Sequence, residues 1–590
     1  MSDNKKDIKK LNIEQLKELS EEIREKILIA TQKNGGHLAS NLGIVETIVA
    51  LYYTFDFPKD KLVFDVGHQC YAHKILSGRE DISSIRTTGG LSGFPDKNES
   101  EYDTFTSGHA GSSISQGLGL AYARDKLHED YYVIDVVGDS ALVNGVNLEA
   151  LFSSNVKPAK HIIILNDNGY GISENKNGLY RRISKNTIKK GYLNSKRFIK
   201  KVFGNSIIAR GLRRVRNFIR NTLSRNNYFE NHGLKYVGVL DGNDIGELVT
   251  MLSRVKEIAK YRAVLVHVNT QKGKGYEKAE QNVNLYHGVG KNYDLISGSF
   301  ARALGSKLNE IIDNDERVVA ITAGMADGTG LSAVEEVHPK NFIDVGIAEE
   351  FAITYASGMA RGNLKPVVAI YSTFMQRAYD QIASDVCLQN LPVVMCIDRA
   401  GLVGADGKTH QGVFDISYLS HLPNLTILAP NTVEELGDML DYALKLNSPV
   451  AIRYPKDAID GEFVKIEDSL WTTLVKGDKV NLIAVGPKML ELALGVSKQV
   501  EGVGVISARS IKPLDQKVLD QIQDTKIITL EENVVSGGFG QAVKNYFAKK
   551  SVNADVNILG VKEEFIEHGS IESQLKYNDF TIENIKKIIS

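Results

Sequence analysis

Gly138-Asp139-Ser140 and Asn166-Asp167-Asn168 are the two stretches that decide the fold of this chain. Each follows an apolar, strand-like run, residues 131–137 before the first and 161–165 before the second. The interval between them leaves room for one crossover helix, expected over about 144–155. If the two strands are parallel neighbours, the polar side chains lie at the carboxyl edge of the sheet, where open α/β sheets bind ligands.

The residue types at this edge suit a magnesium ion. One carboxylate and one amide oxygen are too few for a metal cage made of protein alone, whereas Mg²⁺ is usually held by a few protein oxygens together with phosphates and water. Either tripeptide alone is often a turn or a helix cap. The pair, with both members after strands, favours a site for a Mg-diphosphate cofactor, and it resembles the thiamin diphosphate (ThDP) signature. That signature usually has a glycine where this chain has Ser140.

Composition sets broad limits on the class of protein. The 590 residues, 43% hydrophobic and 24% charged, suffice for roughly three or four globular domains. The net charge of −1 indicates neither a nucleic-acid partner nor a strongly anionic ligand. Three cysteines without a CxxC pair indicate a reducing compartment and no structural zinc. With no signal-peptide core and no long apolar run, we expect a cytoplasmic protein that does not enter a membrane.

Strand-like runs alternate with helix-length segments in three blocks, which predicts an α/β fold with three parallel or mixed sheets. The predicted blocks are residues 1–290, 297–455 and 478–590. The predicted strands are 62–66, 131–137, 161–165 and 263–268 in the first block, 317–322, 342–345, 366–371, 393–398, 425–429 and 450–453 in the second, and 482–485, 503–506, 526–530 and 556–561 in the third.

The segment 175–229 interrupts the first block and carries Lys and Arg without any Asp or Glu. Apolar residues recur in it at helical spacing. A basic amphipathic helix could contact an anionic surface or nucleic acid. A solvated insertion that packs one apolar stripe on the core explains the same pattern, and we favour this second interpretation.

Gly346-Ile347-Ala348-Glu349-Glu350-Phe351 follows the predicted strand 342–345. A Glu at the start of a helix often only complements the helix dipole. Beside a ThDP site, Glu349 has a chemical task, because the aminopyrimidine of the cofactor needs a carboxylic acid hydrogen-bonded to a ring nitrogen. Such a Glu must be sheltered enough to stay protonated part of the time.

Further motifs are spread over nearly the whole chain: Gly36-His37-Leu38-Ala39-Ser40, Asp65-Val66-Gly67-His68-Gln69, Glu99-Ser100-Glu101-Tyr102-Asp103, Ser107-Gly108-His109, Tyr371-Ser372-Thr373-Phe374, Asp398-Arg399-Ala400-Gly401, Thr409-His410-Gln411-Gly412 and Lys512-Pro513-Leu514-Asp515. Together with the motifs above, they make the chain similar to the 1-deoxy-D-xylulose-5-phosphate synthase family of transketolase-like ThDP enzymes. The resemblance implies a diphosphate-binding domain over 1–290 with a variable insertion near 175–229, a pyrimidine-binding domain over 297–455 and a transketolase-like C-terminal domain over 478–590.

Roles for individual residues follow from this resemblance, position by position. It implies Mg²⁺ ligation by Asp139, Asn168 and the carbonyl of Tyr170. It implies catalytic roles for Glu349, which activates the cofactor, and for the proton-handling His37, His68 and His287. The implied cofactor contacts are His68, Gly108, His109, Ala110, Ser140, Ala141, Asn168, Lys272, Tyr276, Glu349 and Phe374. The implied acceptor contacts are Tyr371, Arg399, Asp406, His410 and Arg453, the two guanidinium groups being suited to a phosphate.

The activity implied is ThDP- and Mg²⁺-dependent decarboxylation of pyruvate and transfer of the two-carbon unit to D-glyceraldehyde 3-phosphate, by a homodimer without a nucleic-acid or membrane partner. The product is 1-deoxy-D-xylulose 5-phosphate, an isoprenoid, thiamin and pyridoxal precursor. The alternatives are a transketolase or another ThDP-dependent acyl transferase, a ThDP-binding paralogue without catalysis, and a nucleic-acid binder built on the segment 175–229. Three positions depart from the family pattern, since Glu350 and Phe351 replace Gln and His, and Ser140 replaces Gly.

Overall fold

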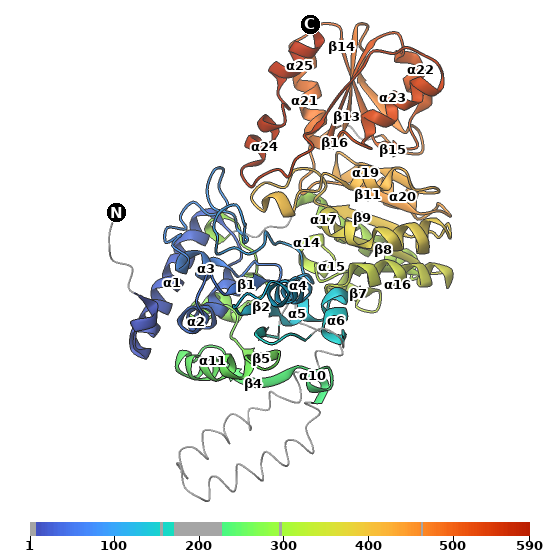
Figure 1. Ribbon diagram of the computed structural model, residues 1–590. Coiled ribbons are helices and arrows are strands. Elements are labelled where there is room, and N and C mark those ends of the chain that lie inside the picture. The colour runs from blue at the N-terminus through green and yellow to red at the C-terminus, as the bar shows by residue number, and fades with distance from the viewer. Residues whose placement is uncertain (1–6, 154–156, 170–226, 294–297, 462–463) are drawn as a thin grey trace, which may run out of the picture. The chain divides into compact units, whose positions relative to one another are not determined.

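The computed structural model describes residues 7–153, 157–169, 227–293, 298–461 and 464–590 (Figure 1). Tyr170 and nearly all of the basic segment 175–229 lie outside the described residues. The chain divides into two compact units. Unit 1 comprises Met1–Ile85 and Gly93–Leu295, and unit 2 comprises Arg86–Ser92 and Ile296–Ser590.

Unit 1 contains one sheet of five parallel strands in the order β1-β2-β3-β5-β4. The strands are β1 (Lys61–Phe64), β2 (Val133–Gly138), β3 (His161–Asp167), β4 (Lys235–Asp241) and β5 (Val264–Asn269). β2 and β3 are neighbours, and Gly138 pairs with Asn166 at their carboxyl ends. The predicted adjacency of the two motifs is therefore confirmed. β4 was not predicted from the sequence. It is an edge strand that is interrupted by Gly238 and mostly only partly buried, so its sequence contains no long apolar run.

Helices cover this sheet and connect its strands (Figure 1). The predicted crossover is α5 (Asp139–Leu142) followed by α6 (Gly145–Phe152), and the side chain of Asn144 caps α6 by accepting from the Val146 amide. α2 (Leu38–Thr54) is rich in apolar residues and almost entirely buried, because α1 and α11 pack against it. The remaining elements are η1 (Ile8–Lys10), α1 (Ile13–Asn34), α3 (Tyr71–Leu76), α4 (Ser113–Lys126), α10 (Asn227–Asn231), α11 (Ile245–Ala259), α12 (Glu277–Gln281) and η2 (Lys291–Tyr293).

Unit 2 contains a seven-stranded sheet in the order β15-β10-β11-β9-β8-β6-β7. All its neighbours are parallel except β15, which comes from the third predicted block and runs antiparallel to β10. The strands are β6 (Val318–Thr322), β7 (Phe342–Asp344), β8 (Lys365–Tyr371), β9 (Val394–Asp398), β10 (Thr426–Leu428), β11 (Val450–Arg453) and β15 (Ser510–Lys512). The helices are α13 (Ser299–Asn314), α14 (Ala326–Thr329), α15 (Ser332–Val337), α16 (Glu349–Arg361), α17 (Ser372–Met375), η3 (Gln376–Ala378), α18 (Tyr379–Gln381), η4 (Ile382–Cys387), η5 (Gly407–Thr409), α19 (Asp415–Leu419) and α20 (Val433–Ala443).

A second sheet in unit 2 has the order β12-β14-β13-β16-β17, with β12 antiparallel to β14. Its strands are β12 (Trp471–Val475), β13 (Val480–Val485), β14 (Val503–Ala508), β16 (Lys526–Val534) and β17 (Val556–Val561). Its helices are α21 (Pro487–Ser497), α22 (Gln516–Ile522), α23 (Phe539–Lys549), α24 (Ile571–Tyr577) and α25 (Ile582–Ile589).

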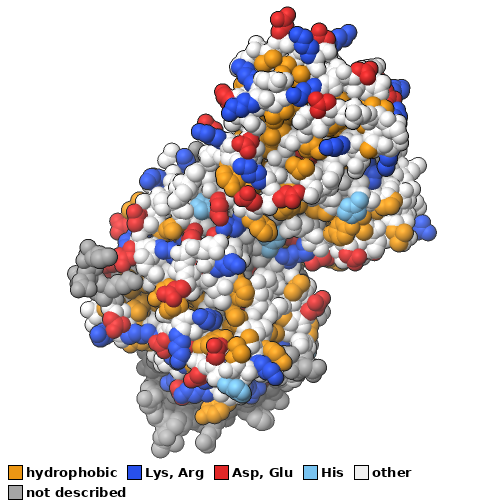
Figure 2. Space-filling model, turned by 45° about the horizontal axis from the view of Figure 1, so that its top comes forward, with side chains coloured by type: hydrophobic (Ala, Val, Ile, Leu, Met, Phe, Trp, Pro, Cys, Tyr) orange, Lys and Arg blue, Asp and Glu red, His pale blue; other side chains and the backbone are white. Residues whose placement is uncertain are grey.

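The three sheets confirm the predicted fold class, α/β with parallel and mixed sheets. Every strand predicted in the second and third blocks is present, while the two antiparallel edge strands β12 and β15 were missed. The three domain ranges stay a prediction. Acidic and basic side chains are interspersed on the face shown in Figure 2, and the net charge of the whole chain is −1. Within the described ranges, no helix has both the length and the apolar character needed to cross a membrane.

Candidate active site

Asp139 begins α5 and is buried directly after β2. Its Oδ1 accepts a hydrogen bond from the Ser140 amide (2.9 Å), and its Oδ2 accepts one from the Gly169 amide (3.2 Å). The second bond ties the end of β2 to the loop that carries Asn168. Burial, reinforced by the nearby Asp167, raises the pKa of Asp139 to about 8. The carboxylate form is therefore costly by itself, and a cation beside it would offset that cost, so these residues fit a Mg²⁺ site.

The other two residues of the second motif have structural partners. Asn166 donates to Gln69 Oε1 (3.0 Å) and accepts from the Thr270 hydroxyl (2.6 Å). The Asp167 carboxylate bonds His267 Nε2 at 2.8 Å. Both side chains are buried, so they fix the end of β3 from which Asn168 follows.

His37, His68 and His287 form one cluster in unit 1. Their ring centroids lie 5.5 Å (His37 to His68), 5.7 Å (His37 to His287) and 5.5 Å (His68 to His287) apart. Burial lowers the pKa of His68 to about 3, and it holds the pKa of His287 well below its ordinary value. Both rings are therefore neutral near pH 7 and can donate and accept protons. His68 Nδ1 is buried without a hydrogen-bond partner among the described residues, which leaves it available to a ligand.

Asp65 connects the loops expected to surround the diphosphate, and we did not single it out from the sequence. Its Oδ1 accepts from the Gly111 amide (2.8 Å), directly after the Gly108-His109-Ala110 stretch. Its Oδ2 accepts from the Ser113 amide and from Asn147 Nδ2, both at 3.1 Å. Asn147 Nδ2 also donates to the carbonyl of Ala141 (2.9 Å). One buried carboxylate thus joins the loop before α4 to the Ser140-Ala141 turn.

The remaining cofactor candidates of unit 1 occupy different settings. Lys272 is buried, which lowers its pKa to about 8 although Asp139 opposes the shift. Tyr276 caps the start of α12 and contacts the Tyr286 ring edge-on at 5.7 Å. Ser140 has helical backbone dihedrals within α5, so its side chain causes no backbone strain where the family has glycine.

In unit 2, Glu349 is the first residue of α16 and is 3% exposed. Burial raises the pKa of its carboxyl to about 7, while the positive charge of Arg377 opposes the shift. Its Oε2 has no hydrogen-bond partner among the described residues. The turn before it is held by Asp344, whose Oδ1 accepts from the amides of Gly324 (2.7 Å) and Gly346 (2.9 Å). This is a sheltered carboxyl with one oxygen that no described protein group contacts, which suits a hydrogen bond to a ligand.

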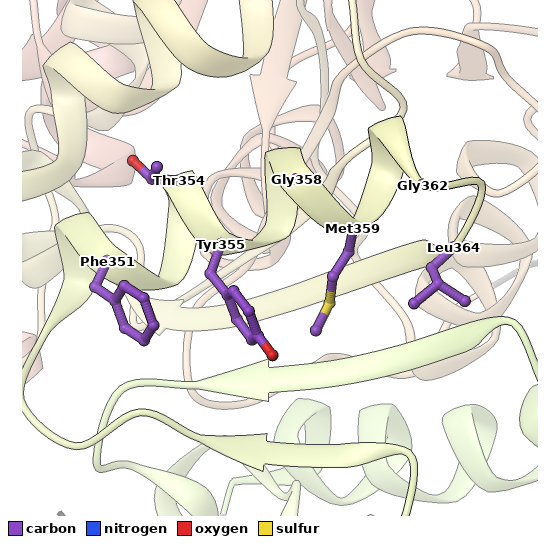
Figure 3. Close-up of a pocket in the computed structure, with 7 residues that line it drawn as sticks. All are labelled: Phe351, Thr354, Tyr355, Gly358, Met359, Gly362 and Leu364. Atoms are coloured by element: carbon purple, nitrogen blue, oxygen red, sulfur yellow. The ribbon is translucent and has the colours of Figure 1, made fainter.

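Phe351, which the resemblance predicts to replace a His of the family, lies on a different face of the same helix. Its side chain is 54% exposed and stacks on Tyr355, with ring centroids 5.2 Å apart. Both rings line an apolar groove on α16 (Figure 3). Phe351 therefore lies on the surface, whereas Glu349 is buried.

Four of the predicted acceptor and pyrimidine contacts lie together in unit 2. The Arg399 guanidinium lies 4.7 Å from the Tyr371 ring centroid, and its Nη1 donates to both Asp398 oxygens at 2.8 Å. Phe374 stacks against Tyr371 at 6.0 Å and meets the edge of the His410 ring at 5.5 Å.

Asp406 has a partner that the sequence did not suggest. Arg86 Nη1 lies 2.8 Å from Asp406 Oδ1, through the short segment Arg86–Ser92 that belongs to unit 2. No local pattern around Arg86 could have revealed a partner more than 300 positions away.

Arg453 lies in a different setting from Arg399. It is buried at the end of β11, where its Nε donates to Asp415 Oδ2 (2.8 Å) and its Nη2 to Asp415 Oδ1 (3.3 Å). Nη2 also donates to the carbonyl of Glu532 (3.4 Å). Since Asp415 occupies the guanidinium fork, a phosphate would have to displace that carboxylate to bind Arg453 in the same way.

Comparison with known proteins places this site in a family. Three family models match: 1-deoxy-D-xylulose-5-phosphate synthase over residues 1–270, the transketolase pyrimidine-binding domain over 298–461 and the transketolase C-terminal domain over 470–585. The 1-deoxy-D-xylulose-5-phosphate synthase of Clostridium tetani is 46% identical, over 98% of this chain and 97% of its own. The chain belongs to the 1-deoxy-D-xylulose-5-phosphate synthase family.

A second synthase supports this assignment. The synthase of the same name from Carboxydothermus hydrogenoformans is 44% identical over 98% of this chain and 96% of its own length. A solved transketolase from Campylobacter jejuni aligns with 98% of this chain and 100% of its own at 18% identity, with a TM-score of 0.42. The family models of the transketolase domains confirm the predicted transketolase-like fold.

The pKa of Glu349 generates a stability prediction for the cofactor-free protein. A folded-state pKa of about 7, above the ordinary 4.5, means that the stabilisation associated with the protonated carboxyl is fully present below pH 4.5 and is lost as pH rises through 7. Glu349→Gln keeps the size of the side chain and stays neutral. We expect it to raise the free energy of unfolding by about 3 kcal/mol at alkaline pH, with the gain fading in acid.

Calorimetric unfolding between acidic and alkaline pH measures this difference. Glu434→Gln, an exposed carboxyl in the first turn of α20, is the matched control and should show no such gain. A Glu349→Gln protein no more stable than the parent at alkaline pH would contradict the buried, uncompensated state of the carboxyl.

Proposed function

We propose that this protein catalyses the ThDP- and Mg²⁺-dependent decarboxylation of pyruvate and transfers the two-carbon unit to D-glyceraldehyde 3-phosphate. The products are 1-deoxy-D-xylulose 5-phosphate and CO₂. The observation that carries the proposal is Glu349, a buried carboxyl with a pKa near 7 and an oxygen without a partner among the described residues. The three cysteines are buried free thiols, as in a reducing compartment, and the proposal places the protein in the cytoplasm.

The residues present fit the cofactor. Asp139, Asn168 and the carbonyl of Tyr170 would hold Mg²⁺. The diphosphate side would be surrounded by His68, Gly108, His109, Ala110, Ser140, Ala141, Lys272 and Tyr276, and the pyrimidine by Phe374 and Glu349. When bound, ThDP supplies the electron sink that decarboxylation of a 2-keto acid needs.

The chain's own residues perform the proton and charge chemistry. The Glu349 carboxyl, protonated part of the time near pH 7, would donate a hydrogen bond to a pyrimidine nitrogen of the cofactor. His68 and His287 are neutral at that pH, and with His37 they would give protons to the substrate and take protons from it. Arg399, held by Asp398 over the Tyr371 ring, binds the phosphate of the acceptor.

The decisive experiment incubates the purified chain with ThDP, Mg²⁺, pyruvate and D-glyceraldehyde 3-phosphate. We expect CO₂ and deoxyxylulose phosphate in equal amounts, followed by mass spectrometry. Omission of Mg²⁺ or ThDP is the control. Two-carbon transfer from a sugar phosphate without release of CO₂ would replace the proposal with a transketolase activity, and cofactor binding without any product would favour a non-catalytic paralogue.

Arg399→Lys tests the acceptor site. A lysine ammonium cannot make the paired hydrogen bonds of a guanidinium to phosphate. We expect the KM for D-glyceraldehyde 3-phosphate to rise about tenfold to hundredfold, because such a rise corresponds to the loss of one charged hydrogen bond. Release of CO₂ from pyruvate alone should be unchanged. Arg317→Lys, on the surface of the same unit, is the matched control. If the KM for the acceptor is unaltered in Arg399→Lys, Arg399 does not bind the phosphate.

We further propose that the protein is a homodimer and that the groove on α16 is covered by a second copy. Phe351, Tyr355 and Met359 project side by side from this helix, and Leu364 extends the row from the turn that follows (Figure 3). Their spacing of four residues makes one continuous apolar stripe. Of the seven residues that line the groove, none is charged.

Tyr355→Glu places a charge in the centre of this stripe. We expect it to shift the protein from dimer to monomer, because a buried unpaired carboxylate opposes association. Sedimentation velocity at several concentrations measures the change. Tyr261→Glu, at a tyrosine that is 84% exposed, is the matched control. If Tyr355→Glu dimerises as tightly as the parent, the dimer contact lies on another face of the protein.

A further inference from the structure

The first turn of α2 contacts all three rings of the histidine cluster or the backbone that carries them. His37 is the residue that precedes this helix. Ser40 Oγ lies 3.4 Å from His287 Nδ1. Asn41, which is 0% exposed, bonds the backbone of both other histidines.

Both polar atoms of the Asn41 side chain, Nδ2 and Oδ1, form hydrogen bonds with the protein. Its Nδ2 donates to the carbonyl oxygens of His37 (2.6 Å) and His68 (2.7 Å). Its Oδ1 accepts from the amide of Tyr71 (2.8 Å), the first residue of α3. One primary amide therefore joins the loop before α2, the loop after β1 and the start of α3.

The three partners of this side chain require two donors and one acceptor, a combination that Asn supplies and few other side chains do. Two carbonyl oxygens require two N–H or O–H donors, and the Tyr71 amide requires an acceptor. An aspartate would direct a negative oxygen at a carbonyl. An apolar side chain would remove all three hydrogen bonds, each at a cost in free energy.

We propose that Asn41 is a positioning residue that sets the separation of the His37 and His68 rings. Fixing both carbonyls fixes the backbone from which the two rings extend, and the ring centroids lie 5.5 Å apart as a result. The proposal deepens the proposed function and rests on it, because the rings handle protons in that reaction. Misplacement of such groups by about 1 Å can cost a hundredfold in rate.

Asn41 also lies in a fully buried helix, so a variant could lose activity merely through a weaker core. Asn578 separates the two effects. It is 1% exposed, donates through Nδ2 to the carbonyl of Gln574 (2.8 Å) and accepts from the amide of Lys562 (3.0 Å), in the part of unit 2 that follows β17. Asn578→Ser thus breaks similar buried bonds away from the histidine cluster.

The experiment compares Asn41→Ser with Asn578→Ser in the full chain. The first readout is the imidazole ¹³C–¹H spectrum of the cofactor-free protein with labelled histidine, with the three cluster rings assigned through single His→Gln variants. We expect the His37 and His68 signals to move in Asn41→Ser and to stay in place in Asn578→Ser. The second readout is steady-state kinetics, where we expect kcat to fall about tenfold to hundredfold with both KM values within about twofold.

Asn41→Asp is the second variant should Asn41→Ser fail to fold, since it keeps the volume and, when protonated, one donor. Signals of His37 and His68 that coincide with those of the parent in a folded Asn41 variant would overturn the proposal, whatever the activity. A kcat loss no larger than that of Asn578→Ser would overturn it as well. A parent chain without synthase activity would instead refute the proposed function, and the ring signals would still decide the role of Asn41.

Discussion

The register between β2 and β3 is the constraint on which the candidate site of unit 1 depends. Because Gly138 pairs with Asn166, the two strands end at the same level and their loops leave the sheet together. Asp139 then reaches the Gly169 amide and closes the gap between the loops. A shift by one residue would turn every side chain of a strand to the opposite face of the sheet. The buried contact between His161 Nε2 and Asp135 Oδ2 (2.6 Å) joins the two strands and opposes such a shift.

In each unit, a carboxyl group accepts hydrogen bonds from the backbone amides of loops. Asp65 accepts from the Gly111 and Ser113 amides in unit 1, and Asp344 plays the corresponding part for Gly324 and Gly346 in unit 2. Glu349 differs from both, since one of its oxygens lacks a partner among the described residues. An unsatisfied buried oxygen costs stability. The protein tolerates that cost at the position where a ligand would remove it, which is typical of functional sites.

Sequence reasoning located the parts of the fold and site that depend on local pattern. The buried central strands and the motifs at their ends were found because apolar runs and turn residues signal them directly. β4, β12 and β15 were missed, since they lie at sheet edges and carry no long apolar run. The ion pair of Arg86 with Asp406 and the occupied fork of Arg453 follow from contacts between distant segments, which no local pattern encodes.

The geometry of α16 places Phe351 and Glu349 in different surroundings. Two positions along a helix correspond to a rotation of about 200°, so residues 349 and 351 cannot face the same neighbours. Glu349 is directed into the unit, and Phe351 joins Tyr355 and Met359 on the outer stripe, four residues apart. The inner face of α16 carries the buried Glu349 carboxyl, one oxygen of which has no hydrogen-bond partner among the described residues. The outer face carries the apolar stripe. Phe351 therefore extends the apolar stripe on a face that does not carry the Glu349 carboxyl.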